Sequence, residues 1–286
     1  MGDRIADPAV FDEVHVSDFQ FQLVREGAVA LLEFDHGKAN EMGSAQLSAF
    51  EALLGELSGD GSVRALISFS RRRSGRGTPI FIAGANVTER GGWSRDEVAA
   101  HVRRQRAVLA KWRRLPLFHV AVVNGVALGW GTEYLITCDY RISCAEASFG
   151  LPETGLGILP GAGGSSELSA LIGLPQAMRL GMTGERISAD EASRIGLVQE
   201  VCEDVDAGLD RARALAARVS RNSPTAIAAF KHAAVEGVGL GPDQRRELEA
   251  VAYEHCLDSG EAAIGRENFA SIREGKPVPW GPRTLL

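Results

Sequence analysis

The sequence predicts an α/β fold in which a parallel-sheet core is followed by a C-terminal helical region. Up to about residue 164, apolar strand-like segments alternate with amphipathic helical segments, a pattern typical of parallel sheets. Beyond residue 164, the apolar residues recur at helical spacing only. The chain has 286 residues, 45% hydrophobic and 24% charged, which suffices for one large domain or one domain with a helical appendage.

The first half of the chain contains the predicted strands. Residues 1–18 are polar and irregular, and predict a flexible N-terminal extension. Residues 19–34 predict a hairpin, because the first strand alternates apolar and polar residues as a half-buried strand does. Apolar runs predict further strands at 63–69, 80–82, 119–126 and 140–144, and amphipathic segments predict helices at 43–57, 94–114 and 130–137.

The second half of the chain predicts helices alone. They are expected at 164–172, 175–182, 189–195, 206–220, 224–236, 243–258 and 260–274. We therefore divide the chain into a core at 19–205 and a C-terminal helical region at 206–286. The C-terminal helices carry apolar residues on faces that look exposed, so they either fold back over the core or dock on another subunit.

Composition excludes several classes of partner. The net charge of −6 and pI near 5.6 argue against nucleic-acid binding. No stretch approaches the ~20 apolar residues of a membrane span, and the N-terminus lacks an apolar signal core, so we expect a cytoplasmic protein without membrane association. The four cysteines show neither CxxC nor zinc-ligand spacing, which favours idle thiols in a reducing compartment and no metal site.

Two glutamates in glycine-rich sequence are the candidate catalytic groups. Glu133 closes the segment 124–133, and Glu153 lies within 149–164. One carboxyl can hold a proton while the other is ionised, which is what adding or removing water requires. The alternative is a solvated glutamate at a helix start, favoured by the helix dipole, together with a surface-loop glutamate. Spacing alone leaves these two interpretations equally supported.

Two glycine-containing turns could supply an oxyanion hole. The segments 83–85 and 129–131 each follow a buried strand, and glycine lets bare backbone N–H groups approach a substrate carbonyl. The amides of Ala85 and Trp130 could converge on one oxygen. In isolation, each segment also fits a structural turn.

Two other segments are candidate anion sites. Residues 160–165 could hold a phosphate at a helix N-terminus, but the segment lacks the GxxxxGK[ST] pattern, so a structural turn is favoured. Residues 71–76 contain four arginines, which suit either a solvated face or a phosphorylated ligand. The six histidines form no motif, no GxSxG elbow occurs, and Asp139 is expected to be structural.

The ordered segments at 121–133, 149–153, 157–164 and 180–192 together resemble the crotonase superfamily, the enoyl-CoA hydratase/isomerase family. The likeness runs from about Phe19 to Gly275 and is strongest over 121–201. It implies a spiral of ββα units that forms a two-sheet core. It also implies a C-terminal helical region involved in oligomerisation and active-site cover, and a homotrimer or dimer of trimers.

The resemblance also implies a chemistry. The substrates are acyl-CoA thioesters, so coenzyme A is part of the substrate and no prosthetic group is bound. The thioester oxygen lies between the amides of Ala85 and Trp130, while Glu133 and Glu153 add water across the α,β double bond of an enoyl-CoA. Further substrate or CoA contacts are implied for Lys38, Ala39, Asn40, Ala83, Gly84, Asn86, Gly129, Gly131 and Pro152.

Other functions fit the same resemblance. The scaffold also carries double-bond isomerisation, decarboxylation or C–C hydrolysis of a β-diketone, and a non-catalytic acyl-CoA-binding protein is a third interpretation. The family usually has a small residue at the position of Trp130 and an aspartate at that of Asn86. The indole of Trp130 is expected either to narrow the acyl pocket or to support the turn.

Overall fold

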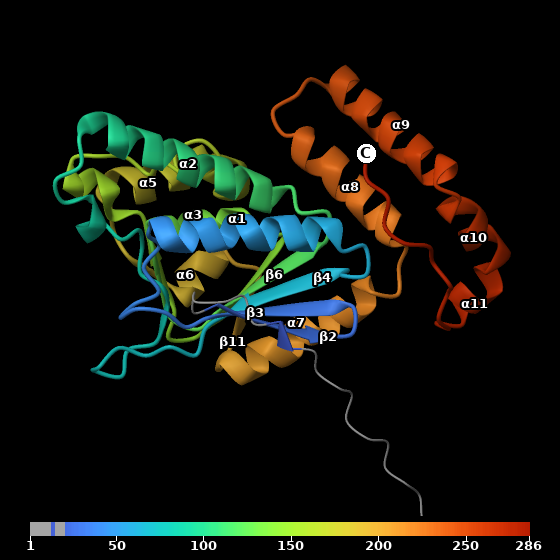
Figure 1. Cartoon of the computed structure of the whole chain (residues 1–286), viewed down its shortest axis with the longest axis horizontal. Helices are drawn as coiled ribbons and strands as arrows, with labels where there is room; N and C mark the ends of the chain where they lie inside the picture. The colour runs from blue at the N-terminus through green and yellow to red at the C-terminus, as the bar shows by residue number, and fades with distance from the viewer. Residues whose placement is uncertain (1–12, 15–20) are drawn as a thin grey trace, which may run out of the picture.

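The computed structural model describes residues 13–14 and 21–286, and its two sheets and C-terminal helices confirm the predicted α/β class (Figure 1). The predicted extension at 1–18 lies outside the described residues except for strand β1 (Glu13–Val14). In the described part of the chain, no helix combines the length and apolar character needed to cross a bilayer.

The larger sheet has seven strands among the described residues, in the order β1-β2-β3-β4-β6-β8-β11. The predicted hairpin forms its first edge, with a turn at Gly27, whose φ is 61°. From β3 onward, each strand is parallel to its neighbour. The remaining strands of this sheet are β2 (Phe21–Glu26), β3 (Val29–Phe34), β4 (Ala65–Phe69), β6 (Phe118–Val123), β8 (Tyr140–Cys144) and β11 (Glu200–Cys202).

Three strands of the smaller sheet alternate along the chain with strands of the larger sheet. Its order is β10-β9-β7-β5, where β5, β7 and β9 are parallel and β10 is antiparallel. After β4, β6 and β8 in the large sheet, the chain enters β5, β7 and β9 in the small one. This alternation is the predicted spiral of ββα units. The strands are β5 (Ile80–Ile82), β7 (Val126–Leu128), β9 (Ser148–Gly150) and β10 (Ile187–Ser188).

The single strand predicted at 119–126 is wrong, because the chain changes sheets within it. A Cβ atom on Gly125 would lie 2.0 Å from the carbonyl oxygen of Pro79, so only glycine allows this close approach. The amide of the Asn124 side chain donates to the carbonyls of Arg72 and Ile80, which fixes the crossing. Strand β6 therefore ends at Val123.

Helices cover both faces of the large sheet. In Figure 1, α1 and α2 lie on one side and α7 on the other. Helix α2 begins at a capping box, in which the Glu97 amide donates to the Ser94 hydroxyl and the Glu97 carboxylate accepts from the Ser94 amide. The bounds are α1 (Ser44–Gly59), α2 (Arg95–Arg113), α3 (Trp130–Ile136), α4 (Leu168–Ile172), α5 (Leu174–Thr183), α6 (Ala189–Arg194) and α7 (Val205–Val219).

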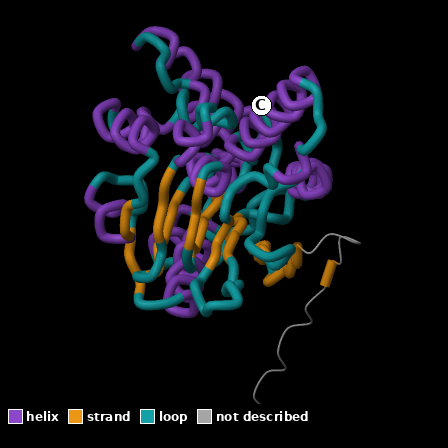
Figure 2. Tube along the Cα trace, turned by 90° about the vertical axis from the view of Figure 1, so that its left-hand side faces the viewer, coloured by secondary structure: helices purple, strands orange, loops and turns teal. Residues whose placement is uncertain are grey.

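Four further helices follow α7. Figure 2 shows most helices gathered in one half of the molecule and the strands in the other. The helix predicted at 260–274 is interrupted at Asn268. Phe230, Tyr253 and Phe269 are 78%, 68% and 62% exposed, which confirms that these helices carry uncovered apolar side chains. The bounds are α8 (Pro224–Glu236), α9 (Pro242–Asp258), α10 (Glu261–Glu267) and α11 (Phe269–Arg273).

Candidate active site

Three parallel strands end at one edge of the small sheet, and each leads into a predicted site segment. Strand β5 continues into 83–85, β7 into Gly129 and Trp130, and β9 toward Glu153. Because β7 lies between β5 and β9, its turn lies between the other two segments. The topology thus brings together segments that are far apart in the sequence.

A cavity of about 200 Å³ lies at this edge. Its wall is mostly apolar, which lowers the local dielectric around any charged group. Both candidate carboxyls line it, from α3 and from the short helix η2 (Pro152–Leu156). The predicted site residues that line the cavity are Ala83, Gly84, Ala85, Gly129, Trp130, Glu133, Pro152 and Glu153.

The amides of Ala85 and Trp130 are both suited to bind a substrate oxygen. The Met42 amide donates to the Gly84 carbonyl over 3.0 Å, and the Asn86 amide donates to the Met42 carbonyl over 2.9 Å. These bonds flank Ala85, so its own amide points away from Met42. Trp130 is the first residue of α3, where helix amides have no intrahelical acceptor.

The start of α3 packs directly on the end of β5. A Cβ atom on Gly131 would lie 2.2 Å from the Ile82 carbonyl oxygen, so this glycine lets the two backbones meet. The contact brings Trp130 alongside the turn after β5. Gly131 therefore acts by packing and does not line the cavity.

Glu133 is held by the glycine-rich loop at 160–165. Its Oε1 accepts hydrogen bonds from the amides of Ala162 and Gly164, over 2.7 and 2.9 Å, and its side chain is only 3% exposed. Burial raises the pKa of Glu133, while the two amides oppose that rise. The loop thus serves as a cap for this carboxylate, which confirms the structural interpretation of 160–165 over the phosphate site.

Glu153 lies in a different environment. Its side chain is half-buried, and its Oε2 forms no hydrogen bond with the described residues. Burial raises the pKa of Glu153 to about 7; its own backbone amide lowers it and the charge of Glu133 raises it further. Near neutral pH the pair can therefore hold one proton, with Glu133 favoured as the ionised partner because two amides donate to it.

Trp130 both lines the cavity and supports its turn. The indole stacks on Tyr134, with ring centroids 5.8 Å apart and planes 15° apart. Phe50 meets it edge-on, with centroids 5.7 Å apart, and Trp130 is 2% exposed. The two expected roles of this side chain, narrowing the pocket and supporting the turn, are compatible in this position.

The segment 38–40 lies beside the site without lining the cavity. Asn40 is fully buried, and its amide donates to the carbonyls of Phe34 and Phe81 and to the Ser70 hydroxyl. The Ala83 amide donates to the Ala39 carbonyl over 3.0 Å, so the segment is tied to the turn after β5. The Asn40 side chain shapes the loop, and a CoA contact at Lys38 or Ala39 stays a prediction.

Asn86 caps the turn that follows residues 83–85. Its Oδ1 accepts hydrogen bonds from the amides of Thr88 and Glu89, at the start of the short helix η1 (Thr88–Arg90). An acceptor at this position is sufficient for the cap, and Asn86 does not line the cavity.

Three arginines of the basic loop form ion pairs with carboxylates. Arg71 pairs with Asp206 over 2.6 Å, Arg72 with Asp35 over 2.5 Å, and Arg73 with Glu146 over 3.4 Å. None of these arginines lines the cavity of the two glutamates. These contacts favour the interpretation of residues 71–76 as a solvated, ion-paired face over a site for a phosphorylated ligand.

Asp139 and a buried histidine are structural. The Asp139 carboxylate accepts from the His119 amide and pairs with Lys231 over 2.7 Å, as expected for a structural aspartate. The His119 ring lies 3.0 Å from the Ser68 hydroxyl, a pairing that the sequence did not indicate. Burial lowers the pKa of His119 well below its usual range, and Ser68 is fully buried, so no substrate reaches this pair.

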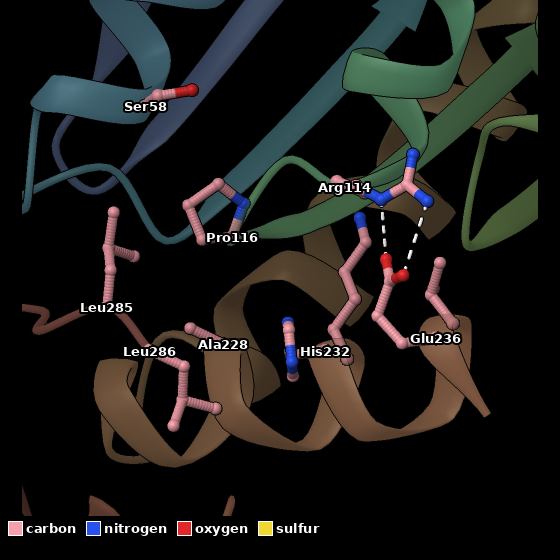
Figure 3. Close-up of a pocket in the computed structure, with 10 residues that line it drawn as sticks. Ser58, Arg114, Pro116, Ala228, His232, Glu236, Leu285 and Leu286 are labelled. Atoms are coloured by element: carbon pink, nitrogen blue, oxygen red, sulfur yellow. Dashed lines mark hydrogen bonds and ion pairs between the residues drawn. The ribbon is translucent and has the colours of Figure 1, made fainter. Parts of the chain in front are cut away.

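A second cavity joins the C-terminal helices to the core and contains none of the predicted site residues. Figure 3 shows Leu285 and Leu286 beside α8, together with the ion pair between Arg114 and Glu236. A third cavity, of about 540 Å³, reaches Glu133 from the side of α2 and α8.

Sequence reasoning missed Arg90 and Gln105, which line the cavity of the two glutamates. The sequence pattern could have indicated Gln105. This polar residue lies at helical spacing with Val108, Leu109 and Trp112, in the buried stripe of α2. No local pattern distinguishes Arg90 from the many solvent-exposed arginines of the chain.

Comparison with known proteins agrees with this fold. Residues 25–281 match the enoyl-CoA hydratase/isomerase family. The chain is 36% identical over 258 residues to the short-chain-enoyl-CoA hydratase of Clostridium acetobutylicum, covering 88% of this chain and 95% of that protein. It is 32% identical over 253 residues to the crotonyl-CoA hydratase of Syntrophomonas wolfei, covering 88% and 95%.

A solved structure gives the same result. An enoyl-CoA hydratase from Bacillus anthracis matches with a TM-score of 0.82 at 31% identity, covering 91% of this chain and 98% of that one. The fold is therefore that of the crotonase superfamily, whose members include enzymes acting on acyl-CoA thioesters. Within it, the chain belongs to the enoyl-CoA hydratase/isomerase family, as its motifs predicted.

Proposed function

We propose that this protein is an enoyl-CoA hydratase, which adds water across the α,β double bond of an enoyl-CoA thioester. The observation that carries the proposal is the pairing of Glu133 and Glu153 at one cavity. One carboxyl is held by two backbone amides, and the other has a pKa of about 7. The C. acetobutylicum and S. wolfei relatives, named as hydratases, support the same reaction.

The proposed reaction uses each group in a distinct role. The thioester oxygen accepts hydrogen bonds from the amides of Ala85 and Trp130, which stabilise the negative charge that develops there. The Glu133 carboxylate orients a water molecule and takes its proton as the water oxygen bonds to the β carbon. The protonated Glu153 donates its proton to the α carbon, and the two carboxyls then exchange one proton to restore the starting state.

The test is loss of the enoyl-thioester absorbance with but-2-enoyl-CoA. We expect Glu133→Gln and Glu153→Gln each to lower kcat by about 10²- to 10⁴-fold, because each removes a proton-transfer group. Binding of the saturated butanoyl-CoA should persist in both variants. Glu146→Gln, which removes only an exposed ion pair, is the matched control. Near-normal hydration by either active-site variant contradicts the proposal.

Double-bond isomerisation is the second candidate. Because Oε1 of Glu133 already accepts two amides, Glu153 is the carboxyl more available to move a proton between the α and γ carbons. But-3-enoyl-CoA discriminates the two reactions. An isomerase converts it to the conjugated thioester even as Glu133→Gln, whereas a hydratase shows strong activity only on but-2-enoyl-CoA and needs both glutamates.

We also propose a homotrimer or a dimer of trimers. The exposed Phe230, Tyr253 and Phe269 of the C-terminal helices are suited to burial between subunits. Light scattering coupled to size-exclusion chromatography tests this, and a monomer at working concentration contradicts it.

The proposed hydration mechanism uses only groups of the protein and the CoA thioester, with no prosthetic group.

A further inference from the structure

Two polar side chains interrupt the otherwise apolar wall beyond the catalytic glutamates. Arg90 comes from the end of η1 and Gln105 from α2, and both line the same cavity as Glu153. Their neighbours in that wall are the apolar Val87, Val102, Leu156, Ile158 and Leu159. A polar pair in such a wall requires a physical explanation, because polar groups buried without partners destabilise a fold.

Gln105 carries a buried donor with no acceptor. The residue is 3% exposed, and its Nε2 donates to none of the described residues. Its Oε1 accepts one long hydrogen bond, of 3.5 Å, from the Arg90 guanidinium. An unsatisfied buried amide donor costs about 1–3 kcal/mol, which an apolar residue in the same stripe of α2 would avoid.

Arg90 carries a half-buried charge without a carboxylate in direct contact. Among residues 13–14 and 21–286 it forms no ion pair, and its Nε forms no hydrogen bond. The neighbouring Glu89 acts on Arg90 through space, but its carboxylate contacts Ser44 and His101. By contrast, Arg104 on α2 pairs with Glu51. Burial lowers the pKa of Arg90, and the charge of Glu89 opposes this effect only in part.

The cavity wall therefore combines one guanidinium with one buried amide donor that lacks an acceptor. Oxygen acceptors on a ligand would satisfy both groups, and a carboxylate would also neutralise the guanidinium.

We infer that Arg90 and Gln105 select a short acyl chain that ends in a carboxylate. This inference rests on the proposed acyl-CoA site and narrows its substrate class to dicarboxylic monothioesters. The guanidinium of Arg90 pairs with the distal carboxylate, and the Gln105 amide donates to one of its oxygens. The cavity of about 200 Å³ suits a chain of a few carbons. A CoA phosphate is the other anion that Arg90 could bind, and the experiment separates the two.

The first arm measures binding of saturated thioesters by isothermal titration calorimetry, because these compounds cannot be hydrated. The probes are 4-carboxybutanoyl-CoA, its neutral isostere 5-methylhexanoyl-CoA, and free CoA. We expect the carboxylated thioester to bind at least about tenfold more tightly than the isostere. Arg90→Gln should abolish this preference and Gln105→Leu should reduce it. Arg103→Gln, an exposed arginine on α2, should preserve it.

Two outcomes of this arm overturn the inference. The first is equal or tighter binding of the neutral isostere by the unmodified protein. The second is that Arg90→Gln weakens both thioesters and free CoA by the same factor, which assigns the guanidinium to a CoA phosphate. Thermal midpoints of Arg90→Gln and Gln105→Leu that are no lower than that of the unmodified protein show that either result reflects the cavity and not a loss of folding.

The second arm measures turnover of 4-carboxybut-2-enoyl-CoA, 5-methylhex-2-enoyl-CoA and but-2-enoyl-CoA. We expect Arg90→Gln to raise KM about tenfold or more for the carboxylated substrate, with little change for but-2-enoyl-CoA. Hydration of but-2-enoyl-CoA without preference for the carboxylated chain overturns this inference alone. If no thioester is hydrated, the proposed function fails, while the calorimetric arm still decides the carboxylate preference.

Discussion

The carboxyl group of Glu153 occupies the space that a side chain at Gly129 would need. A Cβ atom on Gly129 would lie 2.5 Å from Oε1 of Glu153, and the φ of Gly129 is 51°. The Gly129 amide also donates to the Gly150 carbonyl over 2.9 Å, which joins β7 to β9. The turn that presents the Trp130 amide and the helix that presents Glu153 are therefore in direct contact.

This contact predicts that Gly129→Ala inactivates the protein. The methyl group displaces the Glu153 carboxyl, and the positive φ adds backbone strain of about 1–2 kcal/mol. We expect kcat in the but-2-enoyl-CoA assay to fall by about 10²-fold or more, because a small misplacement of a catalytic group has a large effect. Gly55→Ala in α1, where a Cβ meets no neighbouring atom, is the control and should retain activity. Equal activity in the two variants contradicts the prediction.

Hydration should slow as pH rises through about 7. The pKa of Glu153 is about 7, so its proton is lost above that pH, and the proposed hydration mechanism needs the protonated form. The pH profile of kcat/KM should therefore show an alkaline limb near 7 in the unmodified protein. The residual activity of Glu153→Gln should lack that limb. An identical limb in this variant would assign it to another group.

Glu153 should also affect stability in a pH-dependent way. Its pKa is about 7 in the folded protein against an ordinary value of 4.5, so between these two pH values the folded state binds more protons than the unfolded state. The contribution of Glu153 to the free energy of unfolding therefore falls as pH rises from 4.5 to 7. Glu153→Gln should raise Tm relative to the unmodified protein at pH 8 more than at pH 5. Glu191→Gln is the control, because the Glu191 pKa is lowered to about 2 and its effect should be constant in this window.

The strand-end segments of the site could be found from sequence because glycine marks them locally. Gly84, Gly129 and Gly131 each occupy a turn or close contact, and the apolar runs before them identify strands. Strands β9, β10 and β11 escaped prediction because their two or three residues show neither a periodicity nor the continuous apolar run that identified the equally short β5.

Long-range contacts explain what the sequence could not indicate. The amides of Ala162 and Gly164 reach Glu133 across about thirty residues of chain, so local reasoning left 160–165 as an unassigned turn. Asn40 resembled a ligand contact in a loop, yet its four hydrogen bonds hold buried backbone and a buried serine. Arg90 could be singled out only from the fold, because the fold places it in the wall of the cavity that Glu133 and Glu153 line.

Replacement of Trp130 should change substrate preference as well as stability. Trp130→Leu removes the stack on Tyr134 and enlarges the cavity, at an expected cost of about 3 kcal/mol. The ratio of kcat/KM for branched over linear enoyl-CoA substrates should rise, because the indole no longer limits the pocket. Trp93→Leu, which removes an edge contact with His101 away from the cavity, should leave the ratio unchanged. A constant ratio in Trp130→Leu would restrict the indole to supporting the turn.

Arg283 should anchor the C-terminal segment to the core. Its guanidinium is 8% exposed and donates to four backbone carbonyls, at distances of 2.8–3.0 Å. Several of these carbonyls lie at the C-terminal end of α1, where the helix dipole favours a cation. The acceptors are those of Leu57, Ser58, Asp60 and Val63.

Arg283→Met leaves these carbonyls without their donor, so we expect the free energy of unfolding in urea to fall by about 3 kcal/mol. Arg283→Lys should recover only part of the loss, because an ammonium keeps the charge but lacks the planar fork that reaches four acceptors. Arg273→Met, at an exposed position of α11, is the control and should change stability by less than about 0.5 kcal/mol. Equal urea midpoints for Arg283→Met and the control would mean that the tail does not contribute to the stability of the core.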